Sequence, residues 1–235
     1  MTAVRSATFL VMFYLWSVAW VLIIFPLIIG PTRWMVASWT VWVRVIMWLL
    51  RVICGVRIEV RGRQYMPTGG ALIAAKHQSM FDVFAQFAWL PASCFITKQE
   101  LMWIPFFGWY ARKAHMIEVD RAGHSAALRK MVADARSAFA HGRQVVIFPE
   151  GTRTLPGETG DYKPGIAALY RELDVPVSLL ALNTGVHWPL KGLNFKPGLI
   201  VFEYLEPIPP GLKRAEFMRT LQERIETASA ALLVR

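Results

Sequence analysis

A histidine and an aspartate stand five positions apart just after a short apolar run, and this pair could move a proton. His77 and Asp82 follow residues 71–75, which read as a buried strand. Two residues five apart on one helix point roughly 140° away from each other, because each residue turns by ~100°. The side chains can meet if His77 lies on a strand-to-helix turn and Asp82 lies in the first helical turn.

The residues between them favour such a turn. Ser79 is a good N-cap, and Asp82 stands three positions later, as the acidic residue of a capping box does. The helix is expected to run to Leu90 and to stop at Pro91. The result would be a general base beside an orienting carboxylate, with no protein nucleophile. The spacing also fits an aspartate that only favours a helix start.

The chain around this pair alternates short apolar runs with helical stripes. The expected strands are residues 56–61, 71–75, 94–97, 116–119, 145–148, 177–182 and 199–204. Apolar residues recur at helical spacing over residues 128–139, 166–173 and 217–228. This alternation predicts an α/β fold, with a mainly parallel or mixed central sheet covered by helices.

Polar residues follow several of these strands at the point where each strand ends. They are His77, Lys98, Arg121, Glu150, Arg153 and Asn183. The carboxyl ends of parallel strands meet at one edge of a sheet, where α/β proteins place their ligand sites. We therefore expect a base, its orienting acid and several cations to gather around one ligand.

The segment after the strand at residues 145–148 has the composition of an anion-binding turn. Gly151 permits backbone N–H groups to approach an anion, and Arg153 carries a planar fork suited to a phosphate. Glu150 and Thr152 complete this supporting loop. Each of the cationic side chains expected at this edge could also be an ordinary surface residue. Together they indicate a phosphate-bearing ligand.

The N-terminal part of the chain has a different composition. Residues 9–29 are almost wholly apolar, and a bilayer-spanning helix needs about 20 residues. A second apolar segment, residues 34–50, is rich in tryptophan. We expect a membrane-associated helical hairpin over residues 1–54, either spanning the bilayer or lying in one leaflet, and an α/β domain over residues 55–235. A cleaved signal peptide is disfavoured because the apolar stretch is too long.

The charge distribution and the cysteine content indicate the cellular compartment and the class of binding partner. The chain is 55% hydrophobic and 18% charged, and its net charge is +10. Arginines at both ends of the hairpin predict a cell (inner) membrane location with the globular domain on the cytoplasmic face. Cys54 and Cys94 are isolated, which predicts a reducing compartment without disulfides. The basic balance favours anionic lipid over nucleic acid, because no nucleic-acid-binding motif is present.

In these residues the chain resembles the 1-acyl-sn-glycerol-3-phosphate acyltransferase family of membrane phospholipid synthesis. His77 and Asp82 match the His-x-x-x-x-Asp block of that family. Residues 98–121 resemble its second block, residues 150–153 its third, and residues 175–177 the start of its fourth. The chain departs from the family pattern at three positions, which are Lys76, His115 and Leu179.

The resemblance implies direct acyl transfer from an acyl thioester to the free hydroxyl of a lysophospholipid. The implied acceptor is 1-acyl-sn-glycerol 3-phosphate, and the product is phosphatidic acid. His77 would be the general base and Asp82 its orienting acid. The acceptor phosphate would be bound by Lys98, Arg121 and Arg153. The acyl donor would be acyl-CoA or acyl carrier protein, and neither a cofactor nor a metal ion is expected.

Three alternatives stay open at this point. A related acyltransferase would use glycerol 3-phosphate or a lyso-aminolipid. A metal-dependent phosphohydrolase would use His77, Asp82 and Asp120, although the other histidines are scattered along the chain. A membrane lipid-binding protein would have no activity. Turnover in the presence of a chelator excludes the hydrolase, and turnover of any acyl thioester excludes the binder.

Overall fold

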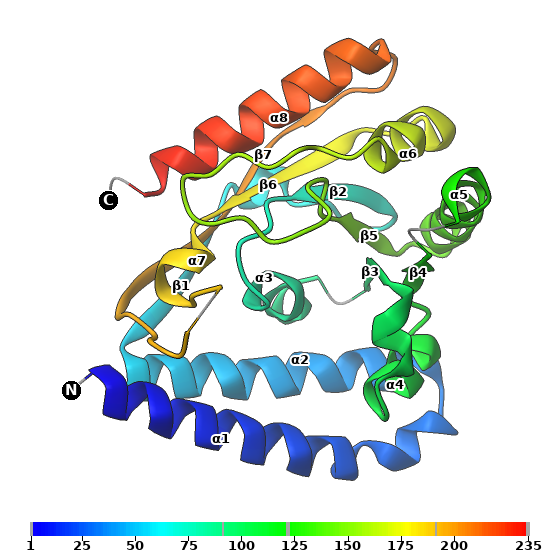
Figure 1. Ribbon diagram of the computed structural model, residues 1–235. Helices are drawn as coiled ribbons and strands as arrows, with labels where there is room; N and C mark the ends of the chain where they lie inside the picture. The colour runs from blue at the N-terminus through cyan, green and yellow to red at the C-terminus, as the bar shows by residue number, and fades with distance from the viewer. Residues whose placement is uncertain (1, 91, 121–122, 191, 234–235) are drawn as a thin grey trace.

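One seven-stranded sheet forms the centre of the molecule, with helices on both of its faces (Figure 1). The computed structural model describes residues 2–90, 92–120, 123–190 and 192–233. The strands are β1 Val56–Arg61, β2 Ala71–Ala75, β3 Ser93–Lys98, β4 Ile117–Val119, β5 Gln144–Ile147, β6 Val177–Leu182 and β7 Gly198–Ile208. Every strand expected from the sequence is therefore present, which confirms the α/β fold.

The sheet is mixed, and its parallel part ends at one edge. The strand order is β1-β7-β6-β2-β5-β3-β4. β6, β2, β5, β3 and β4 run parallel, whereas β7 runs antiparallel to β6 and parallel to β1. Every residue of β2 is buried, as expected for a central strand with both faces covered. The carboxyl ends of the five parallel strands lie together, as the sequence predicts.

Two layers of helices enclose this sheet. The helices are α1 Thr2–Ile23, α2 Thr32–Leu49, α3 Phe81–Phe84, α4 Phe107–Lys113, α5 His124–Ala140, α6 Gly165–Leu173, α7 Thr184–His187 and α8 Arg214–Ala231. The helices predicted from apolar stripes, α5, α6 and α8, lie over one face, and α3 with the α1–α2 pair lies over the other (Figure 1). Alternate residues of β2 serve the two layers: Leu72 and Ala74 join one hydrophobic cluster, Ile73 and Ala75 the other.

The helix that carries Asp82 is shorter than predicted. α3 ends at Phe84 and continues only as a 3₁₀ turn, Ala85–Ala88, instead of an α-helix to Leu90. The Gln86 side-chain amide donates to the Asp82 carbonyl at 2.8 Å, which inserts a side chain into the backbone ladder, and the last turns tighten. The N-cap is Met80 rather than Ser79, whose hydroxyl accepts the Phe81 amide at 3.1 Å.

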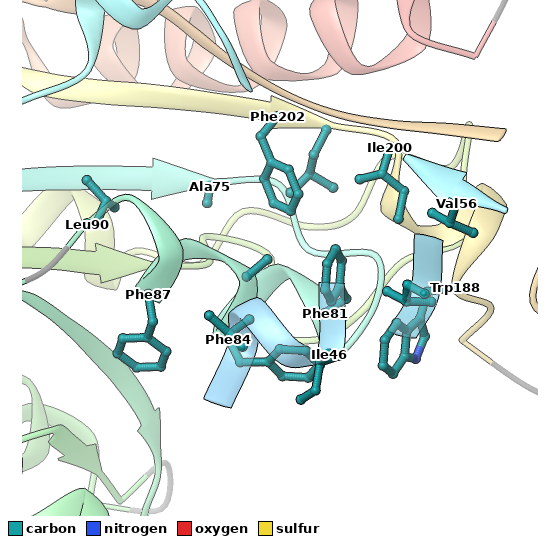
Figure 2. Close-up of a cluster of buried hydrophobic side chains, with 14 of the residues drawn as sticks. Ile46, Val56, Ala75, Phe81, Phe84, Phe87, Leu90, Trp188, Ile200 and Phe202 are labelled. Carbon is teal, nitrogen blue, oxygen red and sulfur yellow. The ribbon is translucent and has the colours of Figure 1, made fainter. Parts of the chain in front are cut away.

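The α1–α2 pair shares a hydrophobic cluster with the sheet. Phe9 of α1 and Ile46 of α2 are fully buried in the cluster that also holds Phe81 and Phe202. Figure 2 shows Phe81 of α3 between Phe202 of β7 on one side and Ile46 on the other. α3 therefore lies between the N-terminal helices and the sheet, beside Trp188 and Phe195, which also contact Phe9.

Much of the outer surface of the α1–α2 pair is apolar and exposed. α1 and the segment Thr32–Cys54 are long and apolar enough to cross a membrane by length and composition. Val11, Leu15 and Val18 of α1 are each more than half exposed. The two helices are joined by a 3₁₀ turn, Phe25–Ile28. These features are consistent with membrane association of this face.

Candidate active site

The carboxyl end of β2 places His77 directly beside Asp82. The Nδ1 atom of His77 lies 3.0 Å from the Oδ2 atom of Asp82. The imidazole stacks on the Phe148 ring, with a centroid distance of 4.1 Å, and is 16% exposed, while Asp82 is fully buried. A carboxylate only accepts hydrogen bonds, so Nδ1 carries the proton and Nε2 is left to accept one from a ligand. The pair has the geometry of a general base and its orienting acid.

Asp82 is held by donors from several directions. Its Oδ2 atom accepts the backbone N–H of Gln78 at 2.5 Å and that of Ser79 at 2.7 Å. Its Oδ1 atom accepts the Ser79 hydroxyl at 3.0 Å and the Thr184 hydroxyl. A buried carboxylate needs such partners, because an unpaired buried charge is costly. The side chain is thus fixed in one orientation toward His77.

The loop after β5 forms hydrogen bonds with the backbone of His77. The His77 N–H donates to the Glu150 carboxylate at 3.1 Å, and the Thr154 N–H donates to the His77 carbonyl at 2.9 Å. Glu150 is almost fully buried, and burial raises its pKa while the nearby Lys76 ammonium opposes that shift. Glu150 therefore acts on the position of His77, and its carboxylate has no open path to a ligand.

A buried ion cluster lies behind the histidine. The Lys76 ammonium is 1% exposed and contacts Glu150 at 2.9 Å and Glu226 of α8 at 2.8 Å. It also donates to the Glu158 carbonyl at 3.0 Å. The Tyr162 hydroxyl donates to Glu226 at 3.0 Å, and burial together with the two carboxylates raises its pKa, so it remains a donor. The cluster ties the C-terminal helix to the strand end that bears His77.

The predicted cations lie at the same edge but at the surface. Lys98 ends β3, and Arg153 follows Gly151, which has a φ of 67°. Both cationic side chains are exposed and form no ion pair with the residues that the structure describes. Thr152 is exposed beside Arg153. Arg121 lies outside the described residues.

Two contacts of the site were not predicted from the sequence. The pairing of Lys76 with Glu226 joins residues 150 positions apart, and only the charge of Lys76 directly after a buried strand signalled it. Thr184 follows Asn183 at the end of β6, where a polar residue was expected, but its contact with Asp82 depends on the sheet order. Both features come from neighbours of β2 that no local pattern identifies.

Loss of the buried ammonium should destabilise the fold strongly. Lys76→Met leaves the buried Glu150 and the partly buried Glu226 without their shared partner, and breaking a buried pair such as Lys76–Glu150 costs about 3–5 kcal/mol. Urea unfolding of the purified protein in detergent measures the change in the free energy of unfolding. Lys130→Met is the matched control, because Lys130 pairs with Asp134 at 2.8 Å on the surface and should cost at most about 1 kcal/mol. Equal losses in the two variants would contradict the cluster's role.

The chain is similar in sequence to known acyltransferases. The family model described as "Acyltransferase" matches residues 57–181, more than half of the chain. A 1-acyl-sn-glycerol-3-phosphate acyltransferase of Pseudomonas aeruginosa is 36% identical over 159 residues, which are 68% of this chain and 62% of that protein. One from Cocos nucifera is 30% identical over 70% of this chain and 53% of its own length. The match thus spans less than two thirds of either relative.

A solved structure has the same fold over the whole chain. The crystal structure of the 1-acyl-sn-glycerophosphate acyltransferase PlsC from Thermotoga maritima superposes with a TM-score of 0.81. It covers 100% of this chain and 99% of the other, at 22% sequence identity. The matched family segment contains His77, Asp82 and the loop at residues 150–153. The chain therefore belongs to the acyltransferase family.

Proposed function

We propose that the chain is a 1-acyl-sn-glycerol-3-phosphate acyltransferase. It transfers a fatty acyl group from an acyl thioester to the free hydroxyl of 1-acyl-sn-glycerol 3-phosphate and forms phosphatidic acid. The observation that carries the proposal is the His77–Asp82 pair, whose Nε2 atom is left to accept a proton at the ligand edge of the sheet. The names of its relatives in the family support the choice of substrate.

The reaction proceeds by direct transfer in this proposal. Nε2 of His77 takes the proton from the acceptor hydroxyl, and the resulting alkoxide attacks the thioester carbonyl carbon. Asp82 stabilises the imidazolium that forms. The tetrahedral intermediate collapses, the carbon–sulfur bond breaks, and the leaving thiolate takes the proton from His77. The donor is acyl-CoA or acyl carrier protein, as a substrate, and the proposal assigns no step to a cofactor or a metal ion.

The exposed cations bind the acceptor phosphate. Arg153 leaves the loop that also holds the His77 backbone, so a ligand bound to its guanidinium lies near the imidazole. Lys98 ends β3, two strands away from β2 in the sheet, and adds a point charge at the same edge. Arg121 follows β4 in the sequence and is assigned to the same phosphate. Arginine suits this task because its fork contacts two phosphate oxygens together.

The acceptor reaches the site from a membrane that contacts the α1–α2 pair. A ridge of apolar side chains lies beside the turn of that pair: Trp103, Ile104, Phe106, Phe107 and Trp109 are all exposed. Phe25 of the turn contacts Phe106 at a centroid distance of 6.4 Å, and the Tyr110 hydroxyl donates to the Val21 carbonyl at 2.6 Å. We place this ridge and α1 in the headgroup region of the inner membrane, with the sheet on the cytoplasmic side.

Site-specific labelling should detect the membrane contact. The native thiols, Cys54 and Cys94, are buried, so Trp103→Cys gives one accessible thiol for an environment-sensitive dye. We expect a blue shift of the dye emission when vesicles that contain anionic phospholipid are added, and quenching by spin-labelled lipid. Lys213→Cys, which precedes α8 on the opposite side of the sheet, is the control and should show neither change. Equal responses at both positions would exclude this orientation.

An activity panel tests the proposed function. The purified chain is assayed with acyl-CoA and with acyl carrier protein as donors, against 1-acyl-sn-glycerol 3-phosphate, glycerol 3-phosphate and a lyso-aminolipid. We expect transfer to the first acceptor, undiminished by a chelator. Preference for another acceptor would change the substrate but keep the reaction. Phosphate release that a chelator abolishes would favour a hydrolase, and the absence of any turnover would favour a lipid-binding protein.

A further inference from the structure

The turn that follows β6 lies against the turn that carries His77 and Asp82. β6 is a parallel neighbour of β2, so the two strands end side by side. Thr184 is fully buried, and its hydroxyl donates to the Oδ1 atom of Asp82. One residue later, the Gly185 N–H donates to the Gln78 side-chain carbonyl at 3.0 Å. Two hydrogen bonds thus connect these segments, which are more than 100 positions apart in the sequence.

We propose that Thr184 is a positioning residue for the His77–Asp82 pair, an inference that rests on the proposed function. The two carboxylate oxygens of Asp82 have separate tasks. Oδ2 contacts Nδ1 of His77, whereas the donors to Oδ1 among the described residues are two hydroxyl groups, those of Ser79 and Thr184. With Oδ1 held on both sides, the carboxylate does not rotate away when His77 becomes charged. Thr184 acts on the reaction through Asp82 and touches no substrate.

The turn itself is anchored on the far side. The Asn183 side chain donates to the carbonyls of Leu199 and Leu232 at 3.2 and 3.3 Å and accepts the Val201 N–H at 2.8 Å. It thereby joins the turn to β7 and to the residue that caps α8. At Gly185 an added Cβ would lie 2.9 Å from Pro156 and 3.0 Å from Gln78, so the backbone there is tightly enclosed. The contacts of Asn183 and the close packing at Gly185 thus hold the backbone on both sides of Thr184, whose hydroxyl faces Asp82.

Ser79 and Thr184 are not equivalent partners. The Ser79 hydroxyl also accepts the Phe81 amide at 3.1 Å, so it has a separate role in the start of α3. Thr184 occupies the first position of a short helix whose turn is already held by Asn183, and its hydroxyl donates to Asp82. Its hydroxyl is therefore better explained by the orientation of the carboxylate than by the formation of α7.

Two substitutions separate the hydroxyl from the shape of the side chain. Thr184→Val keeps the shape and removes the donor, and Thr184→Ser keeps the donor. We expect Thr184→Val to lower kcat about 10-fold or more, because a hydrogen bond to a charged group is lost, with the KM of both substrates within about two-fold. Thr184→Ser should behave like the wild type.

A matched control tests for general damage. Thr40→Val also removes a threonine hydroxyl, one that donates to the Phe87 carbonyl at 2.9 Å in the hydrophobic layer. It should lower the unfolding temperature and leave kcat and both KM values unchanged. The proposal is overturned if Thr184→Val keeps the wild-type kcat, or if Thr184→Ser loses as much activity as Thr184→Val.

A measurement without turnover separates this proposal from the proposed function. In protein with ¹⁵N-labelled histidine, the Nδ1–H signal of His77, identified by its loss in His77→Ala, reports the hydrogen bond to Asp82. It should shift in Thr184→Val and stay in place in Thr40→Val and Thr184→Ser. If the wild type transfers no acyl group, the proposed function fails while this signal still tests the contact. An unchanged signal in Thr184→Val would overturn the positioning role.

Discussion

His77→Ala should lower kcat for acyl transfer at least ~100-fold, the usual scale for loss of a general base. The imidazole is the group at the ligand edge whose Nε2 atom is left to accept a proton, since Nδ1 is occupied by Asp82 at 3.0 Å. The backbone of residue 77 is held by Glu150 and Thr154, contacts that alanine retains. The fold should therefore survive, and steady-state assays of folded protein measure the loss.

Asp82→Asn is the companion variant to that experiment. It should also lower kcat, because an amide cannot stabilise the imidazolium as a carboxylate does. Circular dichroism and the unfolding temperature check that each variant is folded. Near-full acyl transfer by His77→Ala in a preparation free of host enzyme would exclude the proposed mechanism. The general base would then have to be sought among the exposed residues at the same edge of the sheet.

Arg153→Ala should weaken use of the acceptor by ~10- to 100-fold in kcat/KM. Each charge-assisted hydrogen bond contributes roughly 1.5–3 kcal/mol, and the guanidinium can offer two of them to one phosphate. Arg153 is exposed and has no ion pair with the described residues, so its removal should not unfold the protein. Arg153→Lys should restore only part of the loss, since lysine keeps the charge without the fork.

The acceptor itself supplies the control for Arg153. An acceptor that lacks the phosphate should be a poor substrate for the wild type and should lose little further in Arg153→Ala. This comparison is a double-mutant cycle between residue and ligand, and it isolates the phosphate contact from general damage. A raised KM for the acyl donor, with an unchanged KM for the acceptor, would instead assign Arg153 to the phosphates of the donor.

Local patterns were enough to locate the sheet and the His77–Asp82 pair. A short continuous apolar run predicts β2, which is buried on both faces, whereas the 3.6-residue period predicts α5, α6 and α8, each of which buries one face. The parallel order then brings His77, Glu150 and Asn183 to one edge. The meeting of His77 and Asp82 was predicted from the chemistry of the local turn, in which the Ser79 backbone N–H does donate to Asp82, although Met80 and not Ser79 is the N-cap.

Contacts between distant segments could not be read from the chain. The shorter α3 has a local cause instead, because the Gln86 side chain donates to the carbonyl of Asp82, four residues earlier. Lys76 meets Glu226, and Asp82 meets Thr184, only because α8 and β6 lie next to β2. Such pairings depend on the order of the strands, and the same residue types at the same spacing would fit other orders. The roles of Lys98 and Arg153 remain predictions.

The place of β7 has a consequence for how the chain matures during synthesis. β1 is an edge strand, and its neighbour in the described sheet is β7, with Val56 beside Gly198. A ribosome that has made β1 must extend the chain by more than 140 residues before that neighbour exists. Until then β1 is an unpaired edge and Phe81 lacks Phe202 as a partner. The N-terminal helices are synthesised first and can bind the bilayer early. The membrane would then keep the incomplete nascent chain bound until β7, the last strand, completes the sheet.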